Sequence, residues 1–148
     1  MPLPYRQGIF KPQNPQKYKG TSLPVTRSSW EFKFCRFLDL NENIMEWSSE
    51  EPKIPYLNPN TRTMWNYHPD FLVRIKDPKN PLGSRVELIE IKPYKQTLAP
   101  VAKKGKKAQS LLKETQVYNM NQAKWQAARE FCRRQGWTFK VLTERDLF

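Results

Sequence analysis

The sequence has few of the residues that build zinc centres, disulfide frameworks and membrane spans. Among its 148 residues are one histidine and two cysteines, too few for a structural zinc site. Cys35 and Cys132 fall in helical patterns, where a free thiol behaves as a small buried hydrophobe. No stretch approaches the ~20 consecutive apolar residues of a membrane span, and the N-terminus lacks the layout of a signal peptide. We therefore expect a protein of the cytoplasm that does not enter a membrane.

Acidic residues are also scarce, and two long segments of the chain contain none. None occurs before Glu31, and seven lysines but no acid lie between Glu90 and Glu114. With 26 Lys and Arg against 14 Asp and Glu, the net charge is +12. Clustered positive charge of this kind favours binding of a nucleic acid, because bound phosphates release their counterions.

The order of elements predicts one α/β domain with a mixed central β-sheet flanked by helices. Residues 1–25 are rich in proline and basic, so we expect an extended arm that does not pack as an element; residues 26–148 form the domain. We expect helices over 28–40 and 108–135, with Gly136 as the C-cap of the second. The second helix is expected to break near 119–121 and to pack through Met120, Ala123, Ala127 and Phe131. Strands are expected over the following ranges: 44–47, 53–57, 64–67, 71–75, 86–92 and 138–143.

Two short motifs carry the chemistry. Asp70 follows Pro69 at the start of a strand, and Glu90 and Lys92 end a later one. Residues two apart in a strand share a face and lie roughly 7 Å apart, so Glu90 and Lys92 point the same way. If the two strands pair, two carboxylates and an ammonium meet at one edge of the sheet. Carboxylate oxygens suit Mg²⁺, and a lysine there could orient the attacking water, deprotonate it or stabilise the transition state of phosphodiester hydrolysis.

Each motif also has a structural interpretation. A Pro-Asp pair can simply start a strand, and Glu-x-Lys can be a solvated ion pair. His68, beside Pro69, could assist acid–base chemistry, but a surface role is the expectation because no partner motif accompanies it.

The Pro-Asp, spacer and Glu-x-Lys pattern resembles the PD-(D/E)xK, or restriction-endonuclease-like, superfamily. The resemblance implies a restriction-endonuclease-like core and Mg²⁺, with Mn²⁺ as a substitute, and no other small-molecule cofactor. It implies metal ligands at Asp70, Glu90 and the carbonyl of Ile91, with Glu31 on the first helix as a further acidic residue. Glu31 also completes a Ser28-x-x-Glu31 capping box, which would explain it without any metal.

A resemblance over nearly the whole chain is to the head-completion nucleases of T-even-type tailed phages. It rests on segments spread along the sequence, among them 7–12, 14–18, 27–31, 47–51, 54–56, 90–93, 95–97 and 136–139. It implies a DNA endonuclease acting on packaged DNA in head completion, in the cytoplasm of the infected cell and then at the portal vertex of the virion. Double-stranded DNA and portal, head or neck proteins are the partners it implies.

Basic residues near the motifs are candidates for contacts with DNA. A run of lysines follows the Glu-x-Lys strand, and two cations lie on the last helix; the set is Lys95, Lys103, Lys104, Lys106, Lys107, Lys124 and Arg129. A charge run of this kind is also typical of a solvated loop, so both interpretations stay open.

Two further functions fit the sequence. One is a structure-selective nuclease, such as a junction resolvase or a transposon end-cutting subunit. The other is a non-catalytic component of the capsid or portal that binds DNA through its charge, with an idle acidic cluster. Metal-dependent cleavage that is lost in Asp70→Ala would separate the enzyme from the structural protein.

Overall fold

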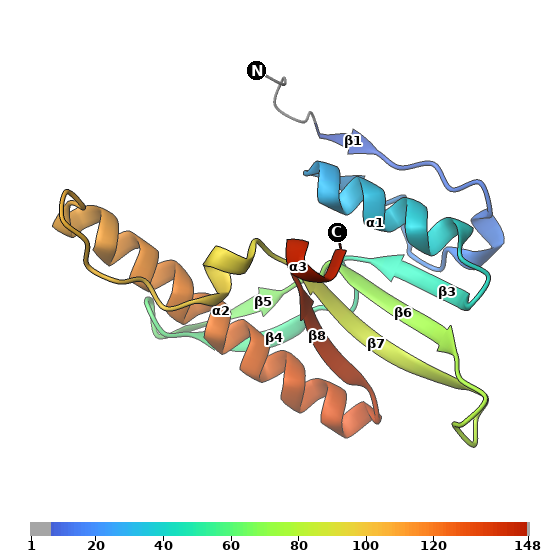
Figure 1. Cartoon of the computed structure of the whole chain (residues 1–148). Coiled ribbons are helices and arrows are strands. Elements are labelled where there is room, and N and C mark those ends of the chain that lie inside the picture. Colours follow the sequence, from blue (N-terminus) through green and yellow to red (C-terminus); the bar gives the residue numbers. More distant parts are fainter. Residues whose placement is uncertain (1–6, 148) are drawn as a thin grey trace.

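A four-stranded sheet forms the centre of the computed structural model, which describes residues 7–147 (Figure 1). The strands, in their order across the sheet, are β3 (Ile44–Ser49), β6 (Phe71–Lys76), β7 (Ser84–Ile91) and β8 (Thr138–Leu142). β6 is antiparallel to both β3 and β7, whereas β8 is parallel to β7. The sheet is therefore mixed, which confirms the α/β architecture expected from the sequence.

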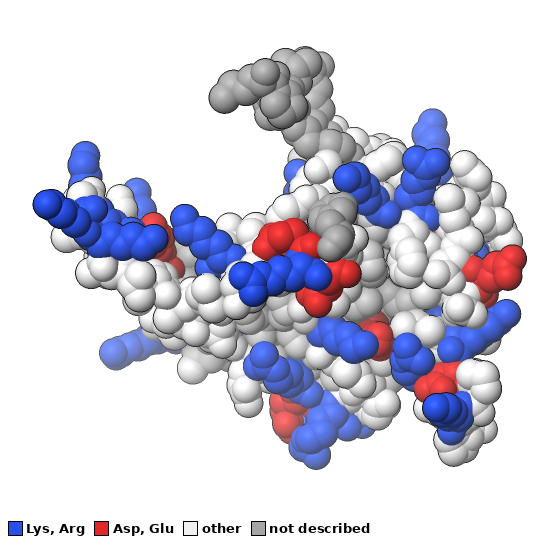
Figure 2. Space-filling view, in the orientation of Figure 1, with Lys and Arg blue, Asp and Glu red and all other residues white. Residues whose placement is uncertain are grey.

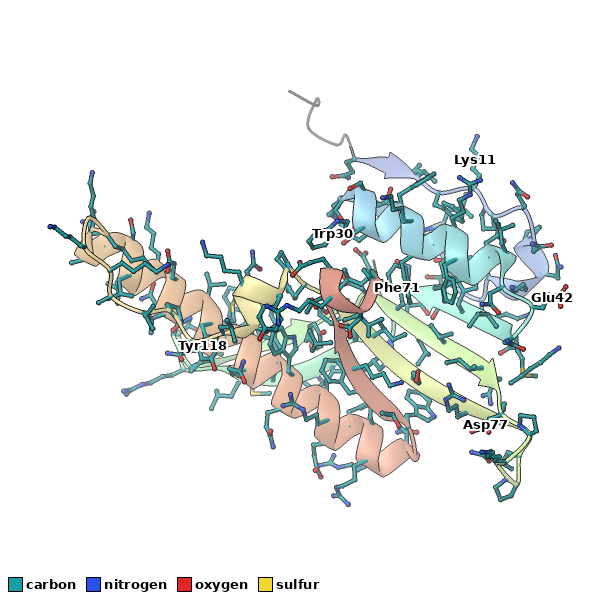
Figure 3. All side chains as sticks on the ribbon, viewed as in Figure 1. Lys11, Trp30, Glu42, Phe71, Asp77 and Tyr118 are labelled. Atoms are coloured by element: carbon teal, nitrogen blue, oxygen red, sulfur yellow. The ribbon has the colours of Figure 1, made fainter. Side chains whose placement is uncertain are left out.

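Helix α1 (Ser29–Leu40) covers one face of the sheet. Its first turn is capped by Ser28, whose Oγ accepts a hydrogen bond from the Glu31 amide at 3.1 Å. Phe34 of α1 meets Phe71 of β6 with ring centroids 5.0 Å apart, and Figure 3 shows Phe71 lying below the helix. Beneath α1 the core also takes Ile89 and Ile91 from β7. The alternate residues of β7 are thus left to face the other layer.

The N-terminal segment corrects one expectation. Within the described residues, β1 (Gly8–Ile9) pairs with β2 (Val25–Thr26), and a 3-10 turn, η1, spans Pro15–Lys17. Phe10 is 6% exposed and belongs to the core under α1, and the Tyr18 ring lies 4.7 Å from Trp47. The expectation of an unpacked arm is therefore wrong for residues 7–25, because single aromatic side chains anchor a segment that has no periodicity. Residues 1–6 lie outside the described part, and the division at residue 25 stays a prediction.

The other face of the sheet is covered by α2 and a hairpin. The hairpin consists of β4 (Ile54–Asn58) and β5 (Thr63–Tyr67), and residues 59–62 connect the two strands. A second core cluster joins Tyr56 and Tyr67 of the hairpin with Leu88 of β7 and Trp125 of α2. The sheet is thus buried on both faces, by two separate apolar clusters.

Helix α2 (Ala108–Gln135) is one continuous element of 28 residues. The predicted break near residues 119–121 is absent, and Gly136 ends the helix with φ 76°, as expected of a C-cap glycine. The buried stripe is Asn121, Trp125, Ala128 and Cys132, whereas the predicted stripe, Met120, Ala123, Ala127 and Phe131, is only partly buried. The buried stripe includes the polar Asn121, so a search for apolar residues at helical spacing did not find it. All buried residues of α2 lie from Asn121 onward, and the N-terminal part of the helix extends away from the sheet (Figure 1).

Two short elements complete the described chain: η2 (Tyr94–Thr97), directly after β7, and α3 (Glu144–Leu147), after β8. Both cysteines are buried and unpaired. Across residues 7–147, no helix has the length and apolar character needed to traverse a bilayer.

Candidate active site

The pairing of β6 with β7 brings the two motifs together. Phe71, the first residue of β6, pairs with Ile89 near the end of β7. Asp70 and Glu90 are the next residues along each strand, so they meet at the same end of the sheet, with Lys92 just beyond. The conditional expectation that these strands lie side by side is confirmed. The burial of apolar side chains on both faces fixes the register of this pairing. A slip of one residue would turn each apolar side chain of β7 to the opposite face of the sheet.

Specific hydrogen bonds hold the two carboxylates. Asp70 Oδ2 accepts from the Ile91 amide at 2.7 Å. Glu90 is 6% exposed, and it accepts a hydrogen bond from the Tyr67 hydroxyl. The Lys92 ammonium lies 3.6 Å from Glu90 Oε1. Each carboxylate thus has a fixed orientation while one oxygen of Asp70 is left without a hydrogen bond in the described structure.

The electrostatics of this pair favour a bound cation. Burial raises the pKa of Asp70 well above its usual range, and the negative charge of Glu90 raises it further, against the lowering effects of the Ile91 amide and Lys92. Burial likewise raises the pKa of Glu90, although Tyr67, Lys92 and Lys124 oppose the rise. Two carboxylates that disfavour each other's ionisation are typical of catalytic and metal-binding sites.

Glu31 lies near Asp70. It lines a small cavity of about 10 Å³ together with Asp70, Glu50 and Cys35, and its charge contributes to the raised pKa of Asp70. Its Oε2 accepts a hydrogen bond from the Arg27 amide at 2.5 Å, next to the Ser28 cap. Glu31 therefore performs the capping role and also faces the acidic pair.

The donor set fits Mg²⁺ better than a softer metal. Among the described residues, no group of three or more His, Cys, Asp or Glu side chains is arranged to hold a metal ion. Two carboxylates, with a backbone carbonyl such as that of Ile91, nevertheless suffice for Mg²⁺, which keeps several of its waters and needs only one or two carboxylates.

The candidate DNA-binding residues fall into two groups. Lys95 lies on η2, and Lys103, Lys104, Lys106 and Lys107 precede α2. Figure 2 shows basic side chains gathered on this projecting part of the molecule. The second group, Lys124 and Arg129, lies on the half of α2 that packs on the sheet.

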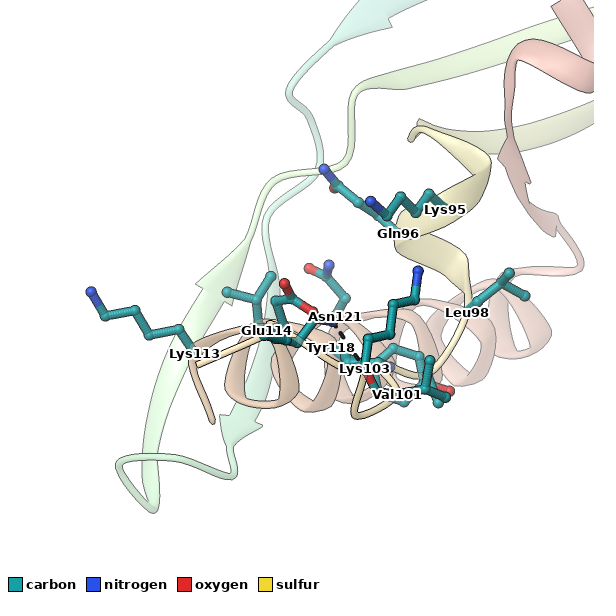
Figure 4. Close-up of a pocket in the computed structure, with 13 residues that line it drawn as sticks. Lys95, Gln96, Leu98, Val101, Lys103, Lys113, Glu114, Tyr118 and Asn121 are labelled. Carbon is teal, nitrogen blue, oxygen red and sulfur yellow. Dashed lines mark hydrogen bonds and ion pairs between the residues drawn. The ribbon is translucent and has the colours of Figure 1, made fainter. Parts of the chain in front are cut away.

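A cavity of about 510 Å³ lies between η2, the segment that follows it and α2 (Figure 4), and neither Asp70 nor Glu90 is among the residues that line it. Its wall combines apolar side chains such as Leu98, Val101 and Val117 with Lys95, Lys103 and Lys106. Lys106 is paired with Glu114 at 2.8 Å. We place the chemistry at Asp70 and Glu90 rather than here, because the one carboxylate that lines this cavity, Glu114, is paired with Lys106.

Two residues next to the motif remain to be compared with the expectations from sequence, His68 and Tyr67. His68 is exposed, in agreement with the surface interpretation. Tyr67 was not identified as a site residue, although it holds Glu90 through its hydroxyl. No local sequence pattern marks it, because a tyrosine at the end of a strand is typical of a core residue. Only the pairing of the hairpin shows that its hydroxyl lies beside Glu90.

A mixed sheet covered on both faces, with an acidic pair and a lysine at the ends of two adjacent strands, defines a restriction-endonuclease-like nuclease domain. Residues 41–144 match the family described as TnsA-like endonuclease N terminal, and the chain belongs to this family. It is also similar to the head completion nuclease of Enterobacteria phage T4. The two are 34% identical over 149 residues, covering 95% of this chain and 92% of that protein.

Proposed function

We propose that this protein is a Mg²⁺-dependent endonuclease that hydrolyses phosphodiester bonds of double-stranded DNA during phage head completion. The observation that carries the proposal is the pair formed by the partly buried Asp70 and the buried Glu90 beside Lys92, at the end of adjacent strands in a chain of net charge +12. The acidic pair accounts for a cation, and the charge of the chain accounts for a polyanionic substrate.

Asp70, Glu90 and the Ile91 carbonyl would hold the cation, with Glu31 available as a further carboxylate. When bound, Mg²⁺ or Mn²⁺ would lower the pKa of a coordinated water and neutralise charge on the phosphate. Tyr67 fixes the Glu90 carboxylate, and the Ile91 amide fixes that of Asp70. Lys92, held beside Glu90, serves the attacking water. The basic residues of η2, the following segment and α2 would bind the backbone of the duplex.

Head completion is favoured over transposon end cutting by the extent of the similarity. The TnsA-like match begins at residue 41, whereas the similarity to the phage T4 protein covers 95% of the chain. It therefore includes most of the N-terminal segment, which packs into the core here. The proposed setting is the infected cell and then the portal vertex, with portal or neck proteins as partners.

Cleavage of supercoiled plasmid tests this function. Wild-type protein should nick or linearise the plasmid with Mg²⁺ or Mn²⁺ but not with EDTA, and Asp70→Ala and Lys92→Ala should abolish cleavage while still binding DNA. Lys79→Ala, in the exposed β6–β7 turn, is the control for loss of one charge. Glu31→Gln keeps an oxygen for the cap, so reduced cleavage in it would indicate a metal role. Absent cleavage with DNA binding intact would instead support the structural protein, and cleavage that persists in EDTA would refute the proposed role of Mg²⁺.

A further inference from the structure

Lys124 is held at the acidic pair by the packing of α2. Its neighbour Trp125 is 3% exposed and lies in the core cluster with Tyr56, Tyr67 and Leu88. Lys124 is itself partly buried. Because Trp125 is fixed in the core, the Lys124 side chain must leave the helix at the rim of this cluster, beside the end of β7.

Two aromatic rings and two carboxylates surround the Lys124 ammonium. Its Nζ lies 5.8 Å from the centre of the Tyr67 ring and 6.0 Å from that of Tyr56. Tyr67 is the residue whose hydroxyl holds Glu90. Burial and the charge of Lys92 lower the pKa of Lys124, whereas Glu90 and Asp70 raise it. The ammonium thus interacts electrostatically with Asp70, Glu90 and Lys92.

Unlike Lys92, Lys124 forms no ion pair with a carboxylate among residues 7–147. Two ring faces attract the ammonium electrostatically, but they use none of the hydrogen-bond directions that a carboxylate or phosphate would take. A partly desolvated cation without an anionic partner is unfavourable. This position is therefore explained best by an anion that arrives with the substrate.

The charges of the site support the same conclusion. Asp70 and Glu90 carry two negative charges, and Lys92 offsets only one of them. A bound divalent cation would reverse this excess, and Lys124 would add a further positive charge. A phosphodiester undergoing attack gathers negative charge on its non-bridging oxygens, which this added charge would stabilise.

We propose that Lys124 is a second catalytic lysine, which contacts the scissile phosphate from the α2 side while Lys92 acts from the β7 side. This inference rests on the proposed nuclease function. It is more specific than a general contact with the DNA backbone, because it places the ammonium at the reacting phosphate and predicts an effect on the rate of the chemical step.

Lys124→Met, which keeps the apolar stem and removes the charge, tests this role beside Lys79→Met as the charge-matched control. The first measurement is Mn²⁺ binding without DNA, followed by electron paramagnetic resonance. Removing a positive charge near the carboxylates should tighten Mn²⁺ binding at least about threefold. Lys79→Met should leave it unchanged. Equal Mn²⁺ affinities in the two variants would overturn the placement of Lys124 at the acidic pair.

The second measurement is the single-turnover cleavage rate at saturating protein. Lys124→Met should reduce it by about 10²–10³-fold, as loss of one preorganised donor to a transition state does, while duplex affinity in EDTA stays close to that of Lys79→Met. A weaker affinity with an unchanged rate at saturation would make Lys124 an ordinary backbone contact and refute the inference. If wild-type protein neither binds Mn²⁺ nor cleaves, the proposed function itself fails, and the inference fails with it.

Discussion

Replacing Asp70 with asparagine should stabilise the metal-free protein and at the same time abolish cleavage. Directly opposed residues in antiparallel strands have Cβ atoms ~4.5–5.5 Å apart, and Asp70 and Glu90 occupy such positions, each one residue beyond the Phe71–Ile89 pair. Two like charges about 5 Å apart repel by roughly 3 kcal/mol at an effective dielectric constant of about 20. Asparagine removes this repulsion and keeps an acceptor for the Ile91 amide.

The net gain is smaller than the repulsion alone. Lys92, 3.6 Å from Glu90, already offsets part of the charge, and a neutral amide accepts the Ile91 hydrogen bond more weakly, by about 1 kcal/mol. We therefore expect the free energy of unfolding to rise by about 1–2 kcal/mol. For a chain of this size, that corresponds to an increase in Tm of about 2–8 °C.

The sign of the pH dependence follows from the raised pKa values of Asp70 and Glu90. Below the unfolded-state pKa of about 4, both carboxyls are protonated in both states, and the substitution changes little. As pH rises through the raised pKa values, the wild-type protein loses stability because two buried charges form. The advantage of Asp70→Asn should therefore be small at pH 4.5 and largest at pH 8.

Thermal unfolding in EDTA, followed by circular dichroism at both pH values, measures this difference. Glu46→Gln is the control, because Glu46 is a half-exposed acid 3.8 Å from Arg74 and its replacement should change stability by no more than about 0.5 kcal/mol. A Tm for Asp70→Asn at or below that of wild type at pH 8 would refute the reasoning. Added Mg²⁺ should raise the Tm of the wild type but not of the variant, since only the wild type keeps both carboxylates.

Two further predictions follow from the same contacts. Tyr67→Phe removes the hydrogen bond that lowers the pKa of Glu90, so the acidic limb of the pH–rate profile should move to higher pH; an unmoved limb with normal Tm would show that Tyr67 does not tune Glu90. Phe10→Ala should lower the free energy of unfolding by about 3–5 kcal/mol, measured by urea denaturation with the exposed Ile9→Ala as control; a loss under about 1 kcal/mol would return the N-terminal segment to the status of an arm.

The sequence predicted well what depends on local order and on strand periodicity. The Ser28 cap, the α1 boundaries and the alternation of Ile89, Glu90 and Ile91 could each be read from a few neighbouring residues. The meeting of Asp70 with Glu90 required one further assumption, that consecutive strands pair. Antiparallel pairing of neighbours is common enough to make that assumption reasonable.

What the sequence did not show depends on packing between distant segments. Phe10 is a lone aromatic in a proline-rich stretch, and only the tertiary structure shows that it enters the core. The buried stripe of α2 begins at the polar Asn121. A search for apolar residues alone therefore assigned the packed face to neighbouring positions of the helix. Lys124 looked like a surface cation because its approach to Glu90 follows from how α2 crosses the hairpin, which no local pattern encodes.

The unbroken α2 sets a minimum length for an effective substrate. Lys124, at the proposed cleavage site, lies 16 residues after Ala108 (124 − 108) in this helix of 28 residues. At a rise of 1.5 Å per residue this separation is about 24 Å, roughly two thirds of the ~34 Å turn of duplex DNA. A duplex that lies along α2 and extends less than about two thirds of a turn beyond the cut would therefore leave the lysines before Ala108 without phosphates.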